Sequence, residues 1–365
     1  MIIAHKIALD PNQSQQTYFA RAGGTARFAY NWALAEWKRQ YRAGEKPSEA
    51  SLRRQLKQHQ GRTVPVDEGD DQNAPQQAIK NLGTAFKNVF AGTGKCPQFK
   101  EKGQHDSFRA DNGSREALRF GGNIKSAVVS RTADRWFVSL TVEMEHVTPI
   151  RENQAVVGVD LGIKALATLS DDTPPIERPK ALKGNAKTLK RLSGSLSRKL
   201  KGSANRLKAK IARLHARISN IRNDALHKLT TDLVKRFDII GVEDLNVRGM
   251  MANRCLARAV ADVGMSEFGR QLPYKADLHG ARIVVADRWF PSSKTCSDCG
   301  HIHAGLTLSE REGWCDACGV VNLRDFAASS AVTACGEEGS GVSPAAAVKP
   351  ASVKQEPKRE TFAHV

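Results

Sequence analysis

A buried parallel strand is indicated by residues 155–162, which read Ala-Val-Val-Gly-Val-Asp-Leu-Gly just short of the midpoint of the chain. The run is apolar, rich in β-branched residues, and ends abruptly in the carboxylate of Asp160. Buried parallel strands have this composition, and functional groups in such sheets gather at the carboxyl ends of the strands. Gly162 leaves the backbone open to the approach of a bulky ligand. Taken alone, this stretch is equally consistent with an Asp that only caps a strand and turn.

Two further acidic positions favour a functional interpretation of Asp160. Residues 237–243 form a second apolar strand that ends in Glu243, with Asp244 directly after it. Asp325 follows a cluster of cysteines, at the start of a predicted helix. Hard cations are bound by carboxylate oxygens that converge from several directions. Three acids from three separate elements therefore predict a site for two Mg²⁺ ions.

The chain is strongly basic, with 56 Lys and Arg against 38 Asp and Glu and a net charge of +18. The excess is concentrated between residues 180 and 222, which contain 14 Lys or Arg and no acid. Apolar residues recur there at alternating spacings of 4 and 3 from Leu207 to Ile221, which predicts a helix with one packing face and one positive face. A face that is merely solvated usually mixes both signs of charge, so the segment favours contact with nucleic acid. The basic residues expected to make this contact are Lys183, Lys187, Lys190, Arg191, Arg198, Lys199, Lys201, Arg206, Lys208 and Lys210.

The sequence argues against a membrane protein or a secreted protein. No segment approaches the run of about 18 apolar residues that a spanning helix needs. The first nine residues are too short for a secretory signal, and His5 and Lys6 interrupt them. Seven cysteines, four of them at metal-ligand spacing, suit a reducing compartment better than a disulfide framework. We therefore expect a cytoplasmic protein with no membrane partner.

Four of the cysteines form two C-x-x-C pairs, Cys296 with Cys299 and Cys315 with Cys318, separated by 15 residues. Thiolates at this spacing bind Zn²⁺ tetrahedrally and fill every position, which makes such a site structural rather than catalytic. A glycine follows the second cysteine of each pair and permits a tight turn. A redox role, the competing interpretation of one C-x-x-C pair, is disfavoured because two matched pairs are present.

The spacing of the apolar residues changes along the chain and predicts different secondary structure in different regions. A short strand is predicted over residues 1–10, helices from about Ser14, and a further helix from Asn73. From 117 to 147 the period becomes 2, so the first ~150 residues are expected to form a small β unit with a helical insertion. Strands alternate with helices from 155 to 290, which predicts an α/β layer.

One short basic segment in the first part of the chain surrounds an aromatic residue. Residues 95–103 read Lys-Cys-Pro-Gln-Phe-Lys-Glu-Lys-Gly. An exposed Phe99 would stack on a base, and the basic residues around it would hold phosphates. A plain charged loop is an equally good interpretation of these residues.

The combination and order of these motifs resemble the TnpB family of insertion-sequence proteins, over residues 1 to about 330. Two weaker family-like segments are 73–78 and 96–100. The strong signatures are 158–162 (Gly-Val-Asp-Leu-Gly), 242–247 (Val-Glu-Asp-Leu-Asn-Val), 291–296 (Pro-Ser-Ser-Lys-Thr-Cys), both cysteine pairs and Arg324-Asp325.

The resemblance implies an RNA-guided DNA endonuclease whose partners are a guide RNA and double-stranded target DNA. By motif position Asp160 is the first catalytic acid, Glu243 the second and Asp325 the third, and together they bind catalytic Mg²⁺. Glu243 is preferred to Asp244 because it occupies the catalytic place of the family. The family also implies a structural Zn²⁺ and a nucleoid-associated location in a prokaryotic cytoplasm.

The implied fold is α+β and multidomain. An N-terminal wedge β-barrel with an inserted helical recognition bundle precedes a RuvC-like, RNase H-type α/β nuclease domain with an inserted zinc ribbon. The expected boundaries are the barrel at 1–13 and 114–150, the recognition bundle at 14–113, the nuclease domain at 151–290 and 321–335 with its basic helical segment at 180–230, the ribbon at 291–320, and a disordered tail at 336–365.

One departure from the family keeps a second function open. Family members usually continue with Asp-Arg-Asp-x-Asn-Ala-Ala after the last cysteine pair, whereas this chain has Leu323 and Ala327 at the first Asp and the Asn. All three acids favour the nuclease, while these two replacements favour a nuclease-inactive RNA-guided DNA-binding repressor. A transposase that joins DNA ends, a third reading, is disfavoured by the cysteine pairs and the family motifs.

Overall fold

In the computed structural model the chain forms two compact units, residues 1–146 and 147–365. Among the described residues, no helix is long and apolar enough to cross a membrane. The structure describes residues 1–59, 73–103, 106–110, 122–145, 148–149, 151, 155–171, 173–198, 204–286, 294–296, 299–302 and 312–323.

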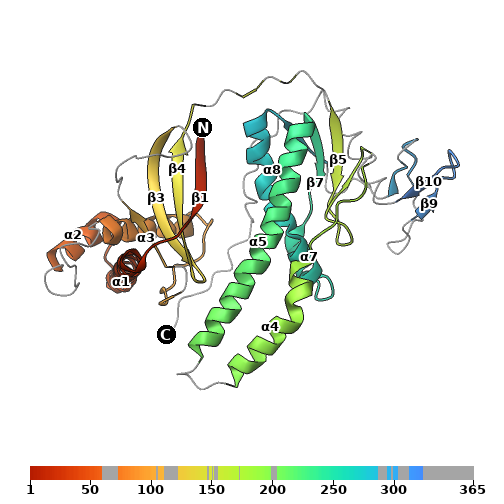
Figure 1. The fold of residues 1–365 in the computed structure, drawn as a ribbon. Helices are drawn as coiled ribbons and strands as arrows, with labels where there is room; N and C mark the ends of the chain where they lie inside the picture. The colour runs from red at the N-terminus through yellow and green to blue at the C-terminus, as the bar shows by residue number, and fades with distance from the viewer. Residues whose placement is uncertain are drawn as a thin grey trace. The chain divides into compact units, whose positions relative to one another are not determined.

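The first unit contains an antiparallel sheet with the strand order β1-β4-β3-β2, of which β1, β4 and β3 are labelled in Figure 1. The strands are β1 (Ile2–Leu9), β2 (Ser107–Ala110), β3 (Asn123–Thr132) and β4 (Arg135–Glu143). The alternating pattern predicted β3 and β4, and the N-terminal strand completes the sheet by pairing along its whole length with β4.

Strand β2 corrects the predicted limits of the helical insertion, because residues 107–110 lie inside the range 14–113 that was assigned to helices. Phe108 of this strand pairs with Val129 of β3, and both side chains are buried. Four residues are too few to show a period of 2, so the strand depends on its partner rather than on its own pattern.

Helices α1 (Gln13–Arg42) and α3 (Asn73–Phe90) pack against β2 of this sheet, and α2 (Glu49–His59) packs against both helices. The side chain of Asn12 caps α1 by accepting from the backbone N–H of Gln15, whose side chain accepts in return from the Asn12 N–H. The core of the unit joins fully buried helical side chains to buried residues of the sheet. Its members include Leu34, Leu52, Ile79, Leu82, Phe108 and Trp136.

The second unit contains a sheet with the strand order β6-β5-β7-β8. The strands are β5 (Val156–Asp160), β6 (Thr168–Leu169), β7 (Ile239–Glu243) and β8 (Arg282–Ala286). β5, β7 and β8 run parallel, and β6 is antiparallel to β5. The predicted α/β layer is therefore confirmed.

Two long helices, α5 (Asn205–Arg236) and α8 (Met265–His279), pack against each other (Figure 1). Leu226 and Leu233 of α5 are fully buried in one core with Leu272 of α8 and with residues of the sheet. Burial of each such side chain contributes about 1.5–3 kcal/mol, so this apolar contact is the main force that holds the helices on the sheet.

The basic segment forms two helices rather than one continuous helix. α4 (Ala181–Ser197) lies beside the N-terminal half of α5 (Figure 1). The sequence between β7 and α8, which has no clear periodicity, forms two short helices, α6 (Val247–Ala252) and α7 (Ala257–Val263).

Candidate active site and metal centre

Asp160 and Glu243 end two neighbouring parallel strands. β5 and β7 pair in the register Val156 with Ile239 through Val159 with Val242, so Asp160 and Glu243 stand at the next register position. Side chains at the same register position of parallel strands point to the same face of the sheet. The structure thus brings the first two predicted acids together at the carboxyl edge of the sheet, and both are half-buried.

Asp244 differs from Glu243 in its surroundings. It follows the end of β7 and is exposed, whereas Glu243 pairs with Ala286 of β8 and is half-buried. Glu243 stands at the register position of Asp160, whereas Asp244 lies beyond the end of the strand. The choice of Glu243 as a catalytic acid stays a prediction, and the structure places this residue, half-buried, at the strand end beside that of Asp160.

The residues at this edge have the right chemistry for a hard cation, because carboxylate oxygens are the ligands that Mg²⁺ prefers. Two of the three predicted acids lie in the described part of the chain, at the same register position of two adjacent strands. Asp325 lies outside the described residues, and so do Arg324 and Ala327.

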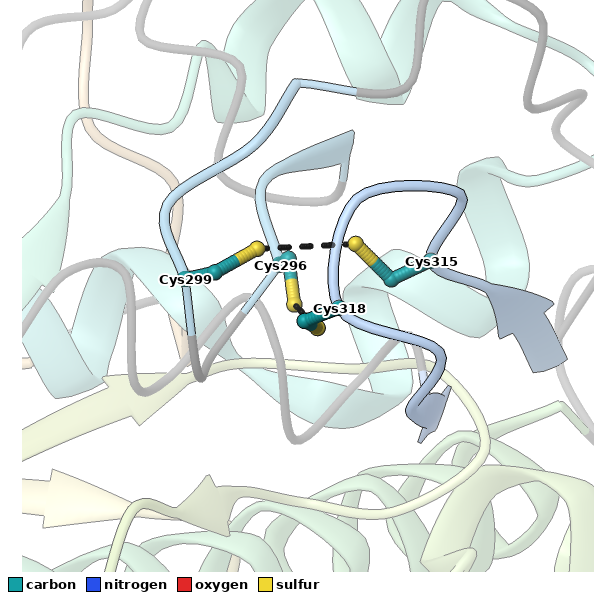
Figure 2. Close-up of side chains that lie close together, drawn as sticks. All are labelled: Cys296, Cys299, Cys315 and Cys318. Carbon is teal, nitrogen blue, oxygen red and sulfur yellow. Dashed lines mark hydrogen bonds between the residues drawn. The ribbon is translucent and has the colours of Figure 1, made fainter.

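The four predicted cysteine ligands converge on one point (Figure 2). The Sγ atoms of Cys296 and Cys318 are 3.7 Å apart, and those of Cys299 and Cys315 are 3.5 Å apart. With Zn–S bonds of about 2.3 Å, a tetrahedral site separates its sulfur atoms by about 3.8 Å. The cluster fits a single tetrahedral metal ion with no further ligand.

The two cysteine pairs have the same backbone geometry. The N–H of Gly300 donates to the carbonyl of Cys296 over 3.1 Å, and the N–H of Gly319 donates to the carbonyl of Cys315 over 2.8 Å. Both glycines have φ near +70°, a conformation that other residues seldom adopt. Strands β9 (Glu312–Trp314) and β10 (Val321–Leu323) form a hairpin around the second pair.

Without a cation, the surroundings of Cys299 and Cys318 raise the pKa of both thiols. The backbone N–H of Val320 lowers the pKa of Cys318. Desolvation and hydrogen bonds with the other three thiols outweigh this effect and raise the pKa to about 12. Four thiolates this close repel one another unless a cation lies between them. A bound metal ion would therefore displace protons from the cluster.

The basic helices present their charges to solvent. Eight of the ten residues predicted to contact nucleic acid lie on α4 or α5 or at the C-terminal end of α4. The side chains of all eight are exposed. Lys199 and Lys201 lie outside the described residues. The described basic residues are Lys183, Lys187, Lys190, Arg191, Arg198, Arg206, Lys208 and Lys210.

Both basic helices are fastened to α7, an arrangement that the sequence analysis missed. The buried carboxylate of Asp262 accepts hydrogen bonds from the backbone N–H groups of Leu182 (2.8 Å) and Lys183 (3.1 Å) at the start of α4. The guanidinium of Arg222 on α5 donates to the carbonyl of Ala261 over 2.7 Å. One signal was available: Asp262 is a lone acid in the apolar run Ala-Val-Ala-Asp-Val of residues 259–263.

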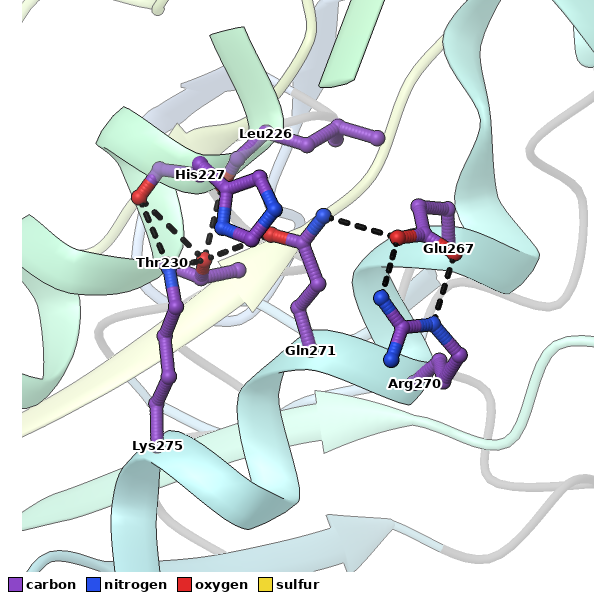
Figure 3. Close-up of polar contacts among 7 residues, drawn as sticks. All are labelled: Leu226, His227, Thr230, Glu267, Arg270, Gln271 and Lys275. Atoms are coloured by element: carbon purple, nitrogen blue, oxygen red, sulfur yellow. Dashed lines mark hydrogen bonds and ion pairs between the residues drawn. The ribbon is translucent and has the colours of Figure 1, made fainter. Parts of the chain in front are cut away.

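A second missed feature is a buried polar network between α5 and α8 (Figure 3). The ammonium of Lys275 donates to the carbonyl of His227 (2.9 Å) and to the hydroxyls of Thr230 (2.7 Å) and Thr231 (2.8 Å). Burial lowers the pKa of Lys275. The network satisfies the polar groups between the helices and fixes how they pack.

Three family models match this chain. The model described as "Probable transposase" of the OrfB IS605 group matches residues 139–254. The helix-turn-helix model of the same group matches residues 1–46, and a Cas12f1-like TNB domain matches residues 266–332.

Two curated relatives align with nearly the whole chain. A protein of Streptomyces pristinaespiralis named as an RNA-guided DNA endonuclease is 37% identical over 98% of this chain and 97% of its own length. The InsQ protein of Escherichia coli K12, with the same description, is 33% identical over 92% of this chain and 94% of its own.

The fold resembles one solved structure in particular. The structure described as a Cas12f1–sgRNA–target DNA complex matches with a TM-score of 0.58 and 13% sequence identity, over 88% of this chain and 83% of the other. At this identity the likeness concerns the α+β multidomain fold.

Proposed function

The chain belongs to the TnpB family of insertion-sequence proteins, and from this premise we propose that it is the RNA-guided DNA endonuclease of a transposable element. The observation that carries the proposal is the shared register position of Asp160 and Glu243 at the carboxyl edge of the sheet. A guide RNA would select the target by base pairing, and the protein would read a short adjacent DNA motif and the backbone of the heteroduplex.

In the proposed mechanism Asp160 and Glu243 at the carboxyl edge of the sheet, together with Asp325, would hold two Mg²⁺ ions. When bound, the ions would activate a water molecule and stabilise the leaving oxygen of the phosphodiester. The protein contributes the placement of the carboxylates, because β5 and β7 are fixed by ladder hydrogen bonds. Val157, Val159 and Ile240 anchor these strands in the core, which limits movement of the two acids.

The remaining parts have supporting roles in this proposal. The exposed basic side chains of α4 and α5 hold nucleic acid by its phosphates. The four-cysteine cluster binds one structural Zn²⁺ and orders the ribbon at residues 291–320. The first unit supplies the wedge barrel and the recognition bundle, and residues 151–290 with 321–335 form a RuvC-like nuclease domain.

A second candidate function is a nuclease-inactive, RNA-guided DNA binder that represses transcription. The specific observation in its favour is Leu323 and Ala327, which replace an Asp and an Asn of the family pattern around Asp325. Loss of a polar neighbour commonly weakens the orientation of a metal-binding carboxylate.

One experiment separates the candidates. The RNA that copurifies with the full-length protein is sequenced, and the complex is incubated with DNA libraries that contain the matching target, in Mg²⁺ or in chelator. The nuclease predicts cleavage that follows the guide when its sequence is changed and that stops in chelator. Stable guide-dependent binding without cleavage identifies the repressor, and absence of any specific RNA contradicts both.

A further inference from the structure

The segment around Phe99 is rigidly attached to helix α1. The side-chain amide of Asn31 donates to the carbonyl of Lys100 over 2.9 Å and accepts from its N–H over 2.8 Å. Asn31 therefore pairs with the backbone of Lys100 as a neighbouring strand would, although the segment is not part of a sheet. This contact joins residues 69 positions apart in the sequence. It fixes the backbone immediately after Phe99.

The side chain of Lys100 strengthens this attachment. Its ammonium lies 4.3 Å from the centre of the Tyr30 ring, which is buried in the core of the first unit. Burial lowers the pKa of Lys100, and the charge of Asp106 partly opposes the effect. Although Lys100 as a whole is exposed, the contact of its ammonium with this buried ring adds a cation–π interaction to the two backbone hydrogen bonds.

Phe99 itself points outward, with 54% of its surface exposed. The ammonium of Lys38 on α1 lies 5.1 Å from the centre of its ring. Tyr41, one turn further along α1, is 64% exposed. A large ring that is held rigidly in water gains nothing from core packing, so its placement beside a cation calls for a ligand with an aromatic face and a negative charge.

We propose that Phe99 is a stacking platform for an unpaired nucleotide of the guide RNA and that Lys38 holds the adjoining phosphate. A base offers a flat face to the ring, and its phosphate matches the ammonium; the bases of a duplex are already stacked and are not available. The inference rests on the proposed function, because it assigns part of the guide RNA to this surface.

The test compares four variants of the full-length protein without Mg²⁺ and without target DNA. The probe is a fluorescent single-stranded oligouridylate, and its dissociation constant is measured by anisotropy at several salt concentrations. Phe99→Leu keeps the apolar surface but removes the aromatic face, and it should weaken binding about 10-fold without changing the salt slope. Phe99→Trp should bind as well as the wild type. Lys38→Gln should reduce the salt slope by about 1.

Phe90→Leu is the matched control, because Phe90 is 68% exposed in the same unit and stacks only on Phe86 among the described rings. Ultraviolet crosslinking of the bound probe, followed by mass spectrometry, should place uridine on the peptide with Phe99 and not on the one with Phe90. Equal binding of the probe by Phe99→Leu and by the wild type overturns the inference. An equal loss in Phe90→Leu overturns it as well, since any exposed ring would then serve.

These measurements are independent of cleavage. If the wild type fails to cut a matched target, the proposed nuclease is lost while the platform is still tested by binding. If the wild type cuts and Phe99→Leu binds normally, only the platform is lost.

Discussion

The carboxylate of Asp262 on α7 lies 3.1 Å from the backbone nitrogen of Lys183 on α4, at a helix start where the N-cap residue itself makes no side-chain cap. The first N–H groups of a helix need acceptors, and a carboxylate there also interacts favourably with the helix dipole. A residue about 80 positions away thus replaces the missing local cap.

Asp262→Ala should therefore loosen the N-terminal end of α4. We expect a loss of about 1–3 kcal/mol, because two N–H groups lose a buried acceptor. Hydrogen exchange at the amides of Leu182 and Lys183 should accelerate, and the unfolding midpoint should fall. Asp224→Ala, which removes an exposed acid from α5, is the control and should change neither measurement. Unchanged protection of both amides in Asp262→Ala would show that the cap contributes nothing.

The basic face of α5 should contribute to nucleic-acid affinity through counterion release. Lys208→Gln with Lys210→Gln should lower the slope of log affinity against log salt by about 2, and affinity should fall to a similar degree for all sequences. The control is Lys228→Gln with Lys235→Gln, which removes the same charge from exposed positions at the other end of the helix. Equal slopes in the two double variants would exclude the N-terminal half of α5 from the interface.

The purified protein should contain one zinc ion per chain. Cys315→Ser removes a buried ligand, so it should abolish the zinc content and destabilise the ribbon, because the binding free energy of such a site is also folding free energy. Cys255→Ser, which changes an exposed cysteine outside the cluster, should keep the metal. Elemental analysis measures both, and a folded, active wild type without zinc contradicts the assignment.

Glu267 should make the stability of the second unit sensitive to acid. Hydrogen bonds from Arg270, together with one from Gln271, lower the pKa of Glu267 to about 2 from an ordinary value of 4.5. A carboxylate with a lowered pKa in the folded state contributes stability above pH 4.5, and that contribution is lost as the pH falls from 4.5 toward 2.

Glu267→Gln should thus lower the free energy of unfolding by about 1–2 kcal/mol at neutral pH. This range takes into account that exposed Arg270 is screened by solvent. The free energy of unfolding should also depend less on pH in the acid range. Asp224→Asn, which alters an exposed ion pair with Lys228, should leave the curve unchanged. Denaturant titrations across the acid range provide the measurement. A variant whose stability parallels the wild type from pH 4.5 downward contradicts this linkage.

Features that depend on short sequence patterns were predictable. The apolar strands that end in Asp160 and Glu243 gave the sheet and two acids of the candidate site, because strand ends and register follow from short patterns. The spacing of the cysteines predicted the four-thiol cluster in the same way.

Features that depend on distant partners were not predictable. Strand β2 is defined by its pairing with β3, and the pairing of Asn31 with Lys100 joins two segments with no shared pattern. The inward turn of Lys275 depends on hydroxyls and a carbonyl of α5, more than 40 positions away. No periodicity of one segment contains such information.

Cleavage should depend on the carboxylates of the candidate site. Asp160→Ala should abolish cleavage and leave RNA binding nearly intact, because losing one carboxylate leaves two close cations poorly compensated. The double variant of Asp160 and Glu243 should be little worse than either single variant, since the acids act as one unit. Asp244→Ala is the control that the register provides: it removes the neighbouring exposed carboxylate and should keep most of the activity.

Asp325 is tested from the opposite direction. Leu323→Asp with Ala327→Asn restores the polar neighbours of the family pattern and should raise the cleavage rate without changing guide affinity. Cleavage of a matched target is followed in Mg²⁺ for all variants, with guide RNA affinity measured in parallel. Wild-type cleavage by Asp160→Ala would end the nuclease assignment. If the wild type binds but never cuts while the restored variant does cut, the chain is a repressor built on a nuclease fold.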